Sequence, residues 1–170
     1  MITQQEKNKT FESVYDALIS DIYAYFNICF GTEAAEDLTQ EIFLRVWRAI
    51  DAEQPPDNWR AWAFRCAVNL KNDYLRRAYL DRGAQEHFIK NAEPSAADDM
   101  QSLSVRLAFD ALDRDTRELL TLKNFGFKSE EIGALLGVSA SAVRTRLQKA
   151  KRVFAEKLET EALTEAALTS

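Results

Sequence analysis

The chain has 170 residues, of which 46% are hydrophobic, so it can fold as one ordinary domain or two small ones, and disorder throughout is excluded. No apolar run approaches the roughly 18 residues of a membrane-spanning helix, and residues 1–10 lack the apolar region of a secretory signal. We therefore expect a cytoplasmic protein without membrane insertion.

The formal charge of −5 is unevenly distributed along the chain. Residues 1–57 carry eleven acids against four cations, whereas residues 58–82 carry six cations against two acids. Residues 137–157 carry six cations against a single acid. Two basic segments therefore lie in an acidic protein, a pattern that indicates nucleic-acid binding by particular elements.

Apolar residues at helical spacing predict two helices before residue 51. Steps of three and four residues join the apolar positions of the first helix, which are Phe11, Val14, Leu18, Ile22, Tyr25 and Cys29. Gly31 is expected to end this helix, and Thr32 to cap the next one. The second helix has an apolar side made of Leu38, Ile42, Phe43, Val46, Trp47 and Ile50.

A long third helix is predicted from about residue 59 to residue 80. Pro55 and Pro56 break the chain before it, and Asp57 or Asn58 is expected to cap it. No segment of the chain shows the period-two alternation of a strand with turn residues at both ends. The fold class is therefore predicted to be all-α.

The apolar pattern weakens at residues 84–102, where we expect a flexible linker between two small helical domains. The first domain is then residues 1–83, the second is residues 103–160, and a tail follows at residues 161–170. The second domain shows four predicted helices, which carry Leu103, Leu107, Ala111 and Leu112, then Leu119, Leu120 and Leu122, then residues 129–136, then Ala140 to about Leu158.

The clearest motif is a predicted helix-turn-helix at residues 129–154. Gly137 supplies the turn, Ser139 is expected to cap the second helix, and Gly133 provides a small residue where the two helices cross. The inward stripe of the second helix is predicted to consist of Val143, Leu147, Ala150 and Phe154.

The opposite face of that helix carries the side chains expected to bind duplex DNA. Recognition helices read base edges from their N-terminal turns, so the candidate readers are Ser141, Arg144, Thr145 and Gln148. The residues expected to hold phosphates are Arg146, Lys149, Lys151 and Arg152, with Ser139 at the start of the same site. An ordinary solvated basic helix is the alternative.

The third helix carries a second candidate surface. Arg65, Asn69, Asn72 and Arg76 recur at helical spacing and share one face. Together with Arg77 they form a narrow arginine and amide stripe suited to phosphates and unpaired bases. A plain amphipathic helix is the alternative here. We expect Asp73 to pair with Arg77 in a structural ion pair.

Cysteine and histidine are too sparse to indicate a metal site, a disulfide framework or catalysis. Cys29 and Cys66 stand singly in apolar helical patterns, which predicts two core residues, and His87 lies in a polar stretch. No glycine-rich phosphate loop and no cysteine–histidine pair is present. We expect no metal, no cofactor and no enzymatic activity.

Three motifs resemble those of the extracytoplasmic-function sigma factors of the sigma-70 family. The predicted second helix contains EDLTQEIFLRVW at residues 36–47, which is similar to region 2.2. The third contains WRAWAFRCAVN at residues 59–69, followed by Asp73 and two arginines, which is similar to regions 2.3 and 2.4. Residues 112–154, with EIG and VRTRL, resemble region 4. The matches follow the family's order and spacing.

The resemblance implies a subunit that gives promoter specificity to bacterial RNA polymerase. It implies that Asp37, Gln40, Glu41 and Arg45 help to dock on the clamp helices of the largest polymerase subunit, and that the protein also meets the polymerase flap. It further implies that the stripe of the third helix lies near the melted minus-10 element and that residues 51–58 hold a flipped minus-10 base. The recognition helix would read the minus-35 element, and an anti-sigma factor would keep the protein inactive.

Three positions depart from the region 4 pattern of the family. Asp113 replaces the usual proline, Gly133 replaces an alanine, and Ala142 replaces a threonine. A helix-turn-helix transcriptional regulator that does not dock on polymerase is the alternative function. The motif at residues 36–47, beside that of the third helix, counts against this alternative.

Overall fold

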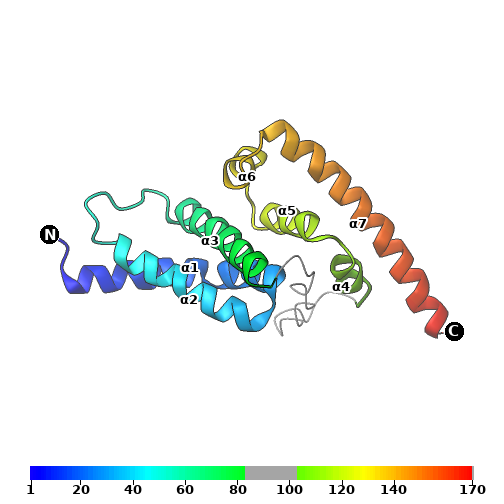
Figure 1. The fold of residues 1–170 in the computed structure, drawn as a ribbon, viewed down its shortest axis with the longest axis horizontal. Coiled ribbons are helices and arrows are strands. Elements are labelled where there is room, and N and C mark those ends of the chain that lie inside the picture. Colours follow the sequence, from blue (N-terminus) through cyan, green and yellow to red (C-terminus); the bar gives the residue numbers. More distant parts are fainter. Residues whose placement is uncertain (83–102, 170) are drawn as a thin grey trace. The chain divides into compact units, whose positions relative to one another are not determined.

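The protein divides into two compact helical units, Met1–Ala92 and Glu93–Ser170, in a computed structural model that describes residues 1–82 and 103–169. The regular structure of these described residues is entirely α-helical (Figure 1). This confirms the predicted all-α class with two helical domains. The limits predicted for the domains stay predictions, and the expected linker with His87 lies outside the described residues.

The first unit contains α1 (Gln4–Phe30), α2 (Thr32–Ala49) and α3 (Trp59–Arg82). Gly31 alone separates α1 from α2, so α2 runs back along α1 (Figure 1). The φ angle of Gly31 is 86°, in a region that residues with a Cβ rarely adopt. A glycine is therefore needed for so tight a reversal.

Of the caps predicted for α2 and α3, the first is wrong and the second is confirmed. Thr32 is not the cap of α2, because Gly31 occupies the N-cap position and Thr32 is already helical. The Thr32 hydroxyl instead donates to Asn27 Oδ1 at 3.4 Å. The cap of α3 is as predicted, since Asn58 Oδ1 accepts from the Ala61 N–H at 3.0 Å.

Aromatic and branched side chains from all three helices form the core of the first unit. The largest of those that are fully buried are Ile22, Tyr25, Phe26, Ile42, Val46, Phe64 and Val68. Complete burial of one such side chain contributes about 1.5–3 kcal/mol to folding. Cys29 is buried among them, as predicted, whereas Cys66 is half-buried, and neither of these two thiols is in a disulfide.

The second unit contains α4 (Leu103–Asp110), α5 (Arg114–Asn124), α6 (Ser129–Leu136) and α7 (Ala140–Thr169). The long helix α7 packs against each of the other three. The buried apolar core of this unit consists of Ala108, Leu112, Leu119, Leu122, Phe127, Ile132, Val143, Leu147 and Ala150.

The pairing of α4 with α7 differs from expectation in two ways. α7 does not end near Leu158 but continues to Thr169, and Glu165 accepts a hydrogen bond from the Ser104 hydroxyl of α4. α4 turns its small residues, Ser104 and Ala108, into this contact and leaves Leu107 43% exposed. Small residues at the contact let the helices approach closely, so Leu103 and Leu107 of the predicted stripe face outward, whereas Leu112 enters the core.

None of the helices in the described ranges is both long and apolar enough to cross a membrane.

Candidate nucleic-acid interfaces

The turn between α6 and α7 is built around two glycines. Gly137 adopts a left-handed conformation with φ 70° and ψ 32°, which ends α6 and reverses the chain. A Cβ placed on Gly133 would lie 2.6 Å from the Val138 carbonyl oxygen, closer than real Cβ contacts. A glycine therefore fits at position 133, because the turn crosses directly over it.

The first turn of α7 is fixed by Ser139 and by the core. Ser139 Oγ accepts from the Ala142 N–H at 3.1 Å, which confirms the predicted cap. Val143, Leu147 and Ala150 are buried as predicted, and the half-buried Phe154 meets Phe109 with 6.4 Å between ring centroids. These contacts set the rotation of α7 and so determine which side chains face solvent.

The predicted DNA-binding side chains of α7 all lie on its exposed surface. The exposed residues include the four candidate readers and the four candidate phosphate contacts, Ser141, Arg144, Thr145, Arg146, Gln148, Lys149, Lys151 and Arg152. Ser139 is exposed too, but its hydroxyl already caps the helix. The structure thus brings the predicted set together on one helix, with Ser139 in a structural role.

The candidate reader Arg144 has an acidic partner that the sequence pattern did not reveal. Glu130 of α6 places Oε1 3.3 Å from Arg144 Nη1, and both side chains are more than half exposed. The pair joins the two helices of the helix-turn-helix across the turn. The signal in the sequence was weak, because Glu130 looks like an ordinary acidic residue in the first turn of a helix.

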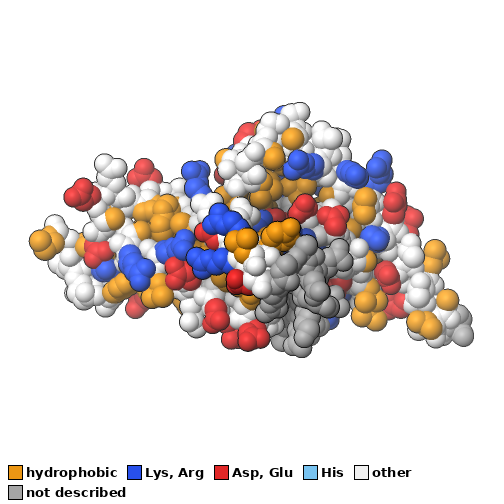
Figure 2. All heavy atoms as spheres, viewed as in Figure 1, with side chains coloured by type: hydrophobic (Ala, Val, Ile, Leu, Met, Phe, Trp, Pro, Cys, Tyr) orange, Lys and Arg blue, Asp and Glu red, His pale blue; other side chains and the backbone are white. Residues whose placement is uncertain are grey.

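The stripe on α3 is exposed along its whole length. The residues that form it are Arg65, Asn69, Asn72, Arg76 and Arg77. On the opposite side of α3, Ala63, Phe64, Ala67 and Val68 are buried in the core. In Figure 2, Lys and Arg side chains gather over α3 and again along α7. Both candidate surfaces are therefore accessible to a polyanion.

Two details of the α3 stripe differ from the sequence prediction. Asp73 does not pair with Arg77 but with Arg76, whose Nη2 lies 2.7 Å from Asp73 Oδ1. Residues three apart on a helix are neighbours as much as residues four apart, so spacing alone did not decide between the two arginines. The stripe also ends on Tyr79, which is 63% exposed and was not singled out, although it follows Arg76 at helical spacing.

The polar patch of α2 lies on the surface of the first unit. Asp37 and Gln40 are exposed, and Glu41 forms an ion pair with Arg45, with 2.9 Å between Oε1 and Nε. Arg45 also lies close to the Cys66 thiol of α3. Burial raises the pKa of this thiol, and Arg45 opposes that effect to a smaller extent. The four predicted polymerase-binding residues therefore share one helix, and two of them, Glu41 and Arg45, form an ion pair with each other.

Comparison with known proteins matches both units to one family. A model of Sigma-70 region 2 matches residues 11–79, and a model of Sigma-70, region 4 matches residues 102–153. The first match contains the α2 patch and the α3 stripe. The second contains the helix-turn-helix.

Curated relatives are RNA polymerase sigma factors. The probable RNA polymerase sigma factor RfaY of Xanthomonas campestris is 34% identical over 136 residues, which are 74% of this chain and 34% of RfaY. The ECF RNA polymerase sigma factor EcfG of Rhodopseudomonas palustris is 32% identical over 125 residues, 71% of this chain and 69% of EcfG. The chain thus spans about a third of RfaY and just over two thirds of EcfG.

Solved structures share the fold. The sigma factor RpoE of Bartonella quintana, crystallised with the anti-sigma factor NepR, superposes with a TM-score of 0.72 at 21% identity, covering 89% of this chain and 98% of that one. CnrH, solved with the cytosolic domain of CnrY, gives 0.58 at 22% identity, covering 93% of this chain and 90% of that one. Together with the two regional matches and the identity to EcfG, these likenesses show that the chain belongs to the extracytoplasmic-function sigma factors of the sigma-70 family.

Proposed function

We propose that the protein binds core RNA polymerase as an alternative sigma factor and directs it to promoters through two separate DNA-binding surfaces. The observation that carries this proposal is that each unit has an exposed surface of its own. The first unit has the arginine and amide stripe of α3, and the second has the basic face of α7. A single DNA-binding domain explains the second surface but not the first. The proposed role consists of binding alone, without enzymatic chemistry, and takes place in the cytoplasm.

The α7 face suits the duplex of a minus-35 element. A helix that follows a tight turn can enter the major groove, where side chains of its first turns reach base edges. Arg144 and Gln148 carry the donors for such readout, and Lys149, Lys151 and Arg152 follow where phosphates would lie.

The α3 face suits the melted strand of a minus-10 element. Arginine offers charge and a flat surface for stacking, and the amides of Asn69 and Asn72 can pair with base edges that duplex formation would hide. Tyr79 extends the same face with an exposed ring. We include it in the proposed site because base stacking on an aromatic ring tolerates any sequence.

The α2 patch is the proposed docking surface for the clamp helices of the largest polymerase subunit. Asp37 and Gln40 are exposed and make no contact that the fold requires among the described residues, whereas the buried side of α2 is apolar except for Thr39. A polar surface of this kind can bind a partner without disturbing the core. We propose that the second unit meets the polymerase flap.

Control by an anti-sigma factor is also part of the proposal. Two structural neighbours were solved in complex with such partners, RpoE with the anti-sigma factor NepR and CnrH with the cytosolic domain of CnrY. By analogy, we propose that a protein of this class covers the α2 and α7 surfaces until a signal releases it.

The decisive experiment is transcription by core polymerase and the purified protein on a randomised promoter library, with sequencing of the transcribed templates. We expect enrichment of two spaced motifs, one at minus-35 and one at minus-10. Tight duplex binding without capture of core polymerase, and without transcription, would instead identify a helix-turn-helix regulator.

A further inference from the structure

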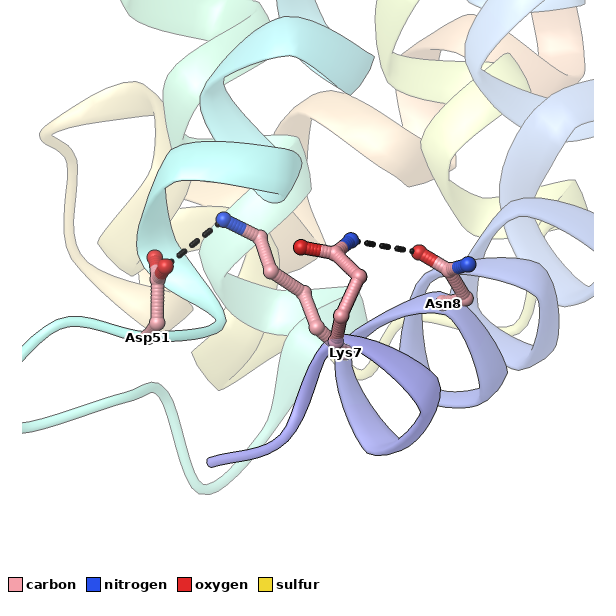
Figure 3. A network of polar contacts seen from close by, with 4 residues as sticks. Lys7, Asn8 and Asp51 are labelled. Atoms are coloured by element: carbon pink, nitrogen blue, oxygen red, sulfur yellow. Dashed lines mark hydrogen bonds and ion pairs between the residues drawn. The ribbon is translucent and has the colours of Figure 1, made fainter. Parts of the chain in front are cut away.

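A lysine in the first turn of α1 lies where α2 ends. The Lys7 side chain is only 12% exposed, and its ammonium group lies 2.7 Å from Asp51 Oδ2 and 4.4 Å from the centroid of the Trp47 ring. Figure 3 shows the Lys7 and Asp51 side chains pointing toward each other. A charged group that is mostly removed from water requires such partners, so the contact is part of the fold and not a chance surface pair.

The position of Lys7 is itself fixed from both sides. The first turn of α1 has a capping box in which the Thr3 N–H donates to Glu6 Oε2 at 2.8 Å and the Glu6 N–H donates to Thr3 Oγ1 at 3.2 Å. One turn after Lys7, the Phe11 ring packs edge-on against Trp47 with 5.3 Å between centroids. The N-terminal turn is therefore a rigid support for the ammonium group.

Asp51 directly follows Ile50, the C-cap of α2, and begins residues 51–58 of the connection to α3. The segment ends at Asn58, whose side chain caps α3. Both ends are thus anchored, the first through Lys7 and the second through the helix cap. Between them the residues are exposed, apart from the half-buried Pro56. The anchors determine how the exposed middle of this segment is presented beside the start of α3.

The negative charge of this segment also affects how it meets DNA. The segment from Asp51 to Asn58 contains three acids, Asp51, Glu53 and Asp57, and no cation. Acids repel a nucleic-acid backbone, and this segment adjoins the helix that carries the proposed minus-10 stripe. The hydrogen bond from Lys7 lowers the pKa of Asp51 and at the same time offsets its negative charge. The contact therefore both holds the segment and reduces its repulsion of DNA.

We infer that Lys7 is a positioning residue for promoter selectivity: acting through Asp51, it holds residues 51–58 in the conformation that receives a base of the single-stranded minus-10 element. The inference rests on the proposed function and on the role that the family resemblance implies for residues 51–58, which is to hold a flipped minus-10 base. Lys7 is too well covered by Asp51 and Trp47 to read the base itself, so its effect passes through the shape and charge of the segment.

The test compares wild-type holoenzyme with four variants. Lys7→Met keeps the packing on Trp47 and removes the charge, and Asp51→Asn removes the charge of the partner. Lys7→Arg keeps the charge, and Lys9→Met removes an exposed cation two residues away as the matched control. Each holoenzyme transcribes one set of templates that carry every base at each minus-10 position behind a fixed minus-35 element. A second set varies every minus-35 position and keeps the minus-10 element fixed.

We expect Lys7→Met and Asp51→Asn to reduce the preference at one minus-10 position about three- to fivefold, as the loss of one partly exposed ion pair would. Minus-35 preference and affinity for core polymerase should stay at wild-type values, and Lys7→Arg and Lys9→Met should behave as wild type. A double variant that exchanges the charges, Lys7→Glu with Asp51→Lys, is expected to recover part of the preference.

Two results would overturn the inference alone. One is wild-type minus-10 preference in both Lys7→Met and Asp51→Asn. The other is an equal loss of preference at every minus-10 and minus-35 position, because that pattern indicates general destabilisation. A wild-type holoenzyme with no minus-10 preference at all would overturn the proposed function, and this inference with it, so the two failures are distinguishable.

Discussion

Arg144, the strongest candidate reader on α7, is held in the free protein by Glu130 of the preceding helix, with 3.3 Å between Nη1 and Oε1. The carboxylate occupies one of the guanidinium donors from which a guanine would otherwise accept. Binding to the major groove therefore has to exchange Glu130 for a base edge or turn it away. The Glu130 carboxylate also places a negative charge beside the surface that DNA phosphates would approach.

Glu130→Gln is expected to increase affinity for duplex DNA about two- to fivefold, because an exposed ion pair contributes about 0.2–1 kcal/mol and its loss releases Arg144. The gain should be larger on a promoter duplex than on a scrambled one, because the released Arg144 is the proposed base reader, and it should shrink as salt rises. Fluorescence anisotropy at two salt concentrations measures it, with Glu159→Gln as an exposed acidic control further along α7. Unchanged affinity would mean that Glu130 does not compete with DNA.

Arg144→Ala and Lys149→Ala are expected to fail in different ways. An arginine on guanine contributes about 1–3 kcal/mol of base discrimination, so Arg144→Ala should relax the minus-35 preference. Lys149→Ala should weaken all duplexes about equally and lower the salt slope by about one, because a phosphate contact carries no base information. Competition binding with promoter and scrambled duplexes separates the two. Equal losses on both duplexes for Arg144→Ala would contradict its assignment as a reader.

Asp37→Ala combined with Gln40→Ala is expected to weaken binding to core polymerase without loss of helicity. Both side chains are exposed, so the change in stability should stay within about 0.5 kcal/mol. Anisotropy with labelled protein and core polymerase gives the affinity, and circular dichroism gives the helicity. Glu12→Ala on α1 removes an exposed acid outside the patch and serves as the control. Wild-type affinity in the double variant would exclude the patch as a docking surface.

Gly133→Ala is expected to destabilise the second unit by about 1–3 kcal/mol, although alanine is ordinarily the better helix former. The new Cβ would lie 2.6 Å from the Val138 carbonyl oxygen, and a backbone atom in a tight turn has little freedom to move away. Hydrogen exchange of α6 and α7 amides reports the loss. Ala134→Gly, at the exposed neighbouring position, should cost about 1 kcal/mol from propensity alone. A destabilisation by Gly133→Ala of less than about 1 kcal/mol would show that the turn can shift.

Asp113 makes the stability of the second unit dependent on pH. Its side chain accepts from the Thr116 N–H at 2.9 Å and caps α5, and this backbone hydrogen bond holds the pKa of Asp113 below its ordinary value of 3.8. Because folding lowers this pKa, the ionised carboxylate contributes its full stabilisation at pH values above the ordinary pKa. That contribution is lost as the pH falls through the lowered pKa. Asp113→Ala should therefore cost about 1 kcal/mol at neutral pH and progressively less in acid.

Urea unfolding of Asp113→Ala, Asp113→Asn and wild type, followed by circular dichroism at neutral and strongly acidic pH, measures this dependence. Asparagine caps helices without a charge, so Asp113→Asn should stay near wild type at neutral pH and retain its cap in acid. A constant difference between wild type and Asp113→Ala at all pH values would show that the cap does not depend on ionisation.

Much of the fold could be predicted because its signals are local. Gly137 adopts the left-handed turn that its position requires, Ser139 and Asn58 cap the helices they precede, and α6 begins and ends at the predicted residues. Each depends on residues a few positions apart, where backbone geometry and hydrogen bonding leave few choices. The exposed faces of α3 and α7 follow from the same periodicity, since their apolar residues enter the core.

Local patterns were misleading where two neighbours compete for one role. Asp73 had an arginine at three and at four residues along the helix, and it pairs with the nearer one, Arg76. Thr32 has the chemistry of a cap, but the positive φ of the preceding glycine made that glycine the N-cap. The helix α7 likewise continues to Thr169, where Glu165 meets Ser104 of α4, although the buried apolar positions of α7 end at Ala150.

By itself, the sequence determined the helices, the turn of the helix-turn-helix and the identity of the side chains on each exposed face, because these depend on spacing and local propensity. Only the tertiary structure decided which distant groups meet: Lys7 with Asp51, Glu130 with Arg144, and Ser104 with Glu165. Such pairs are separated by 44, 14 and 61 residues. Their contact depends on how the helices pack, and packing is set by the whole apolar core, which periodicity within one helix does not describe.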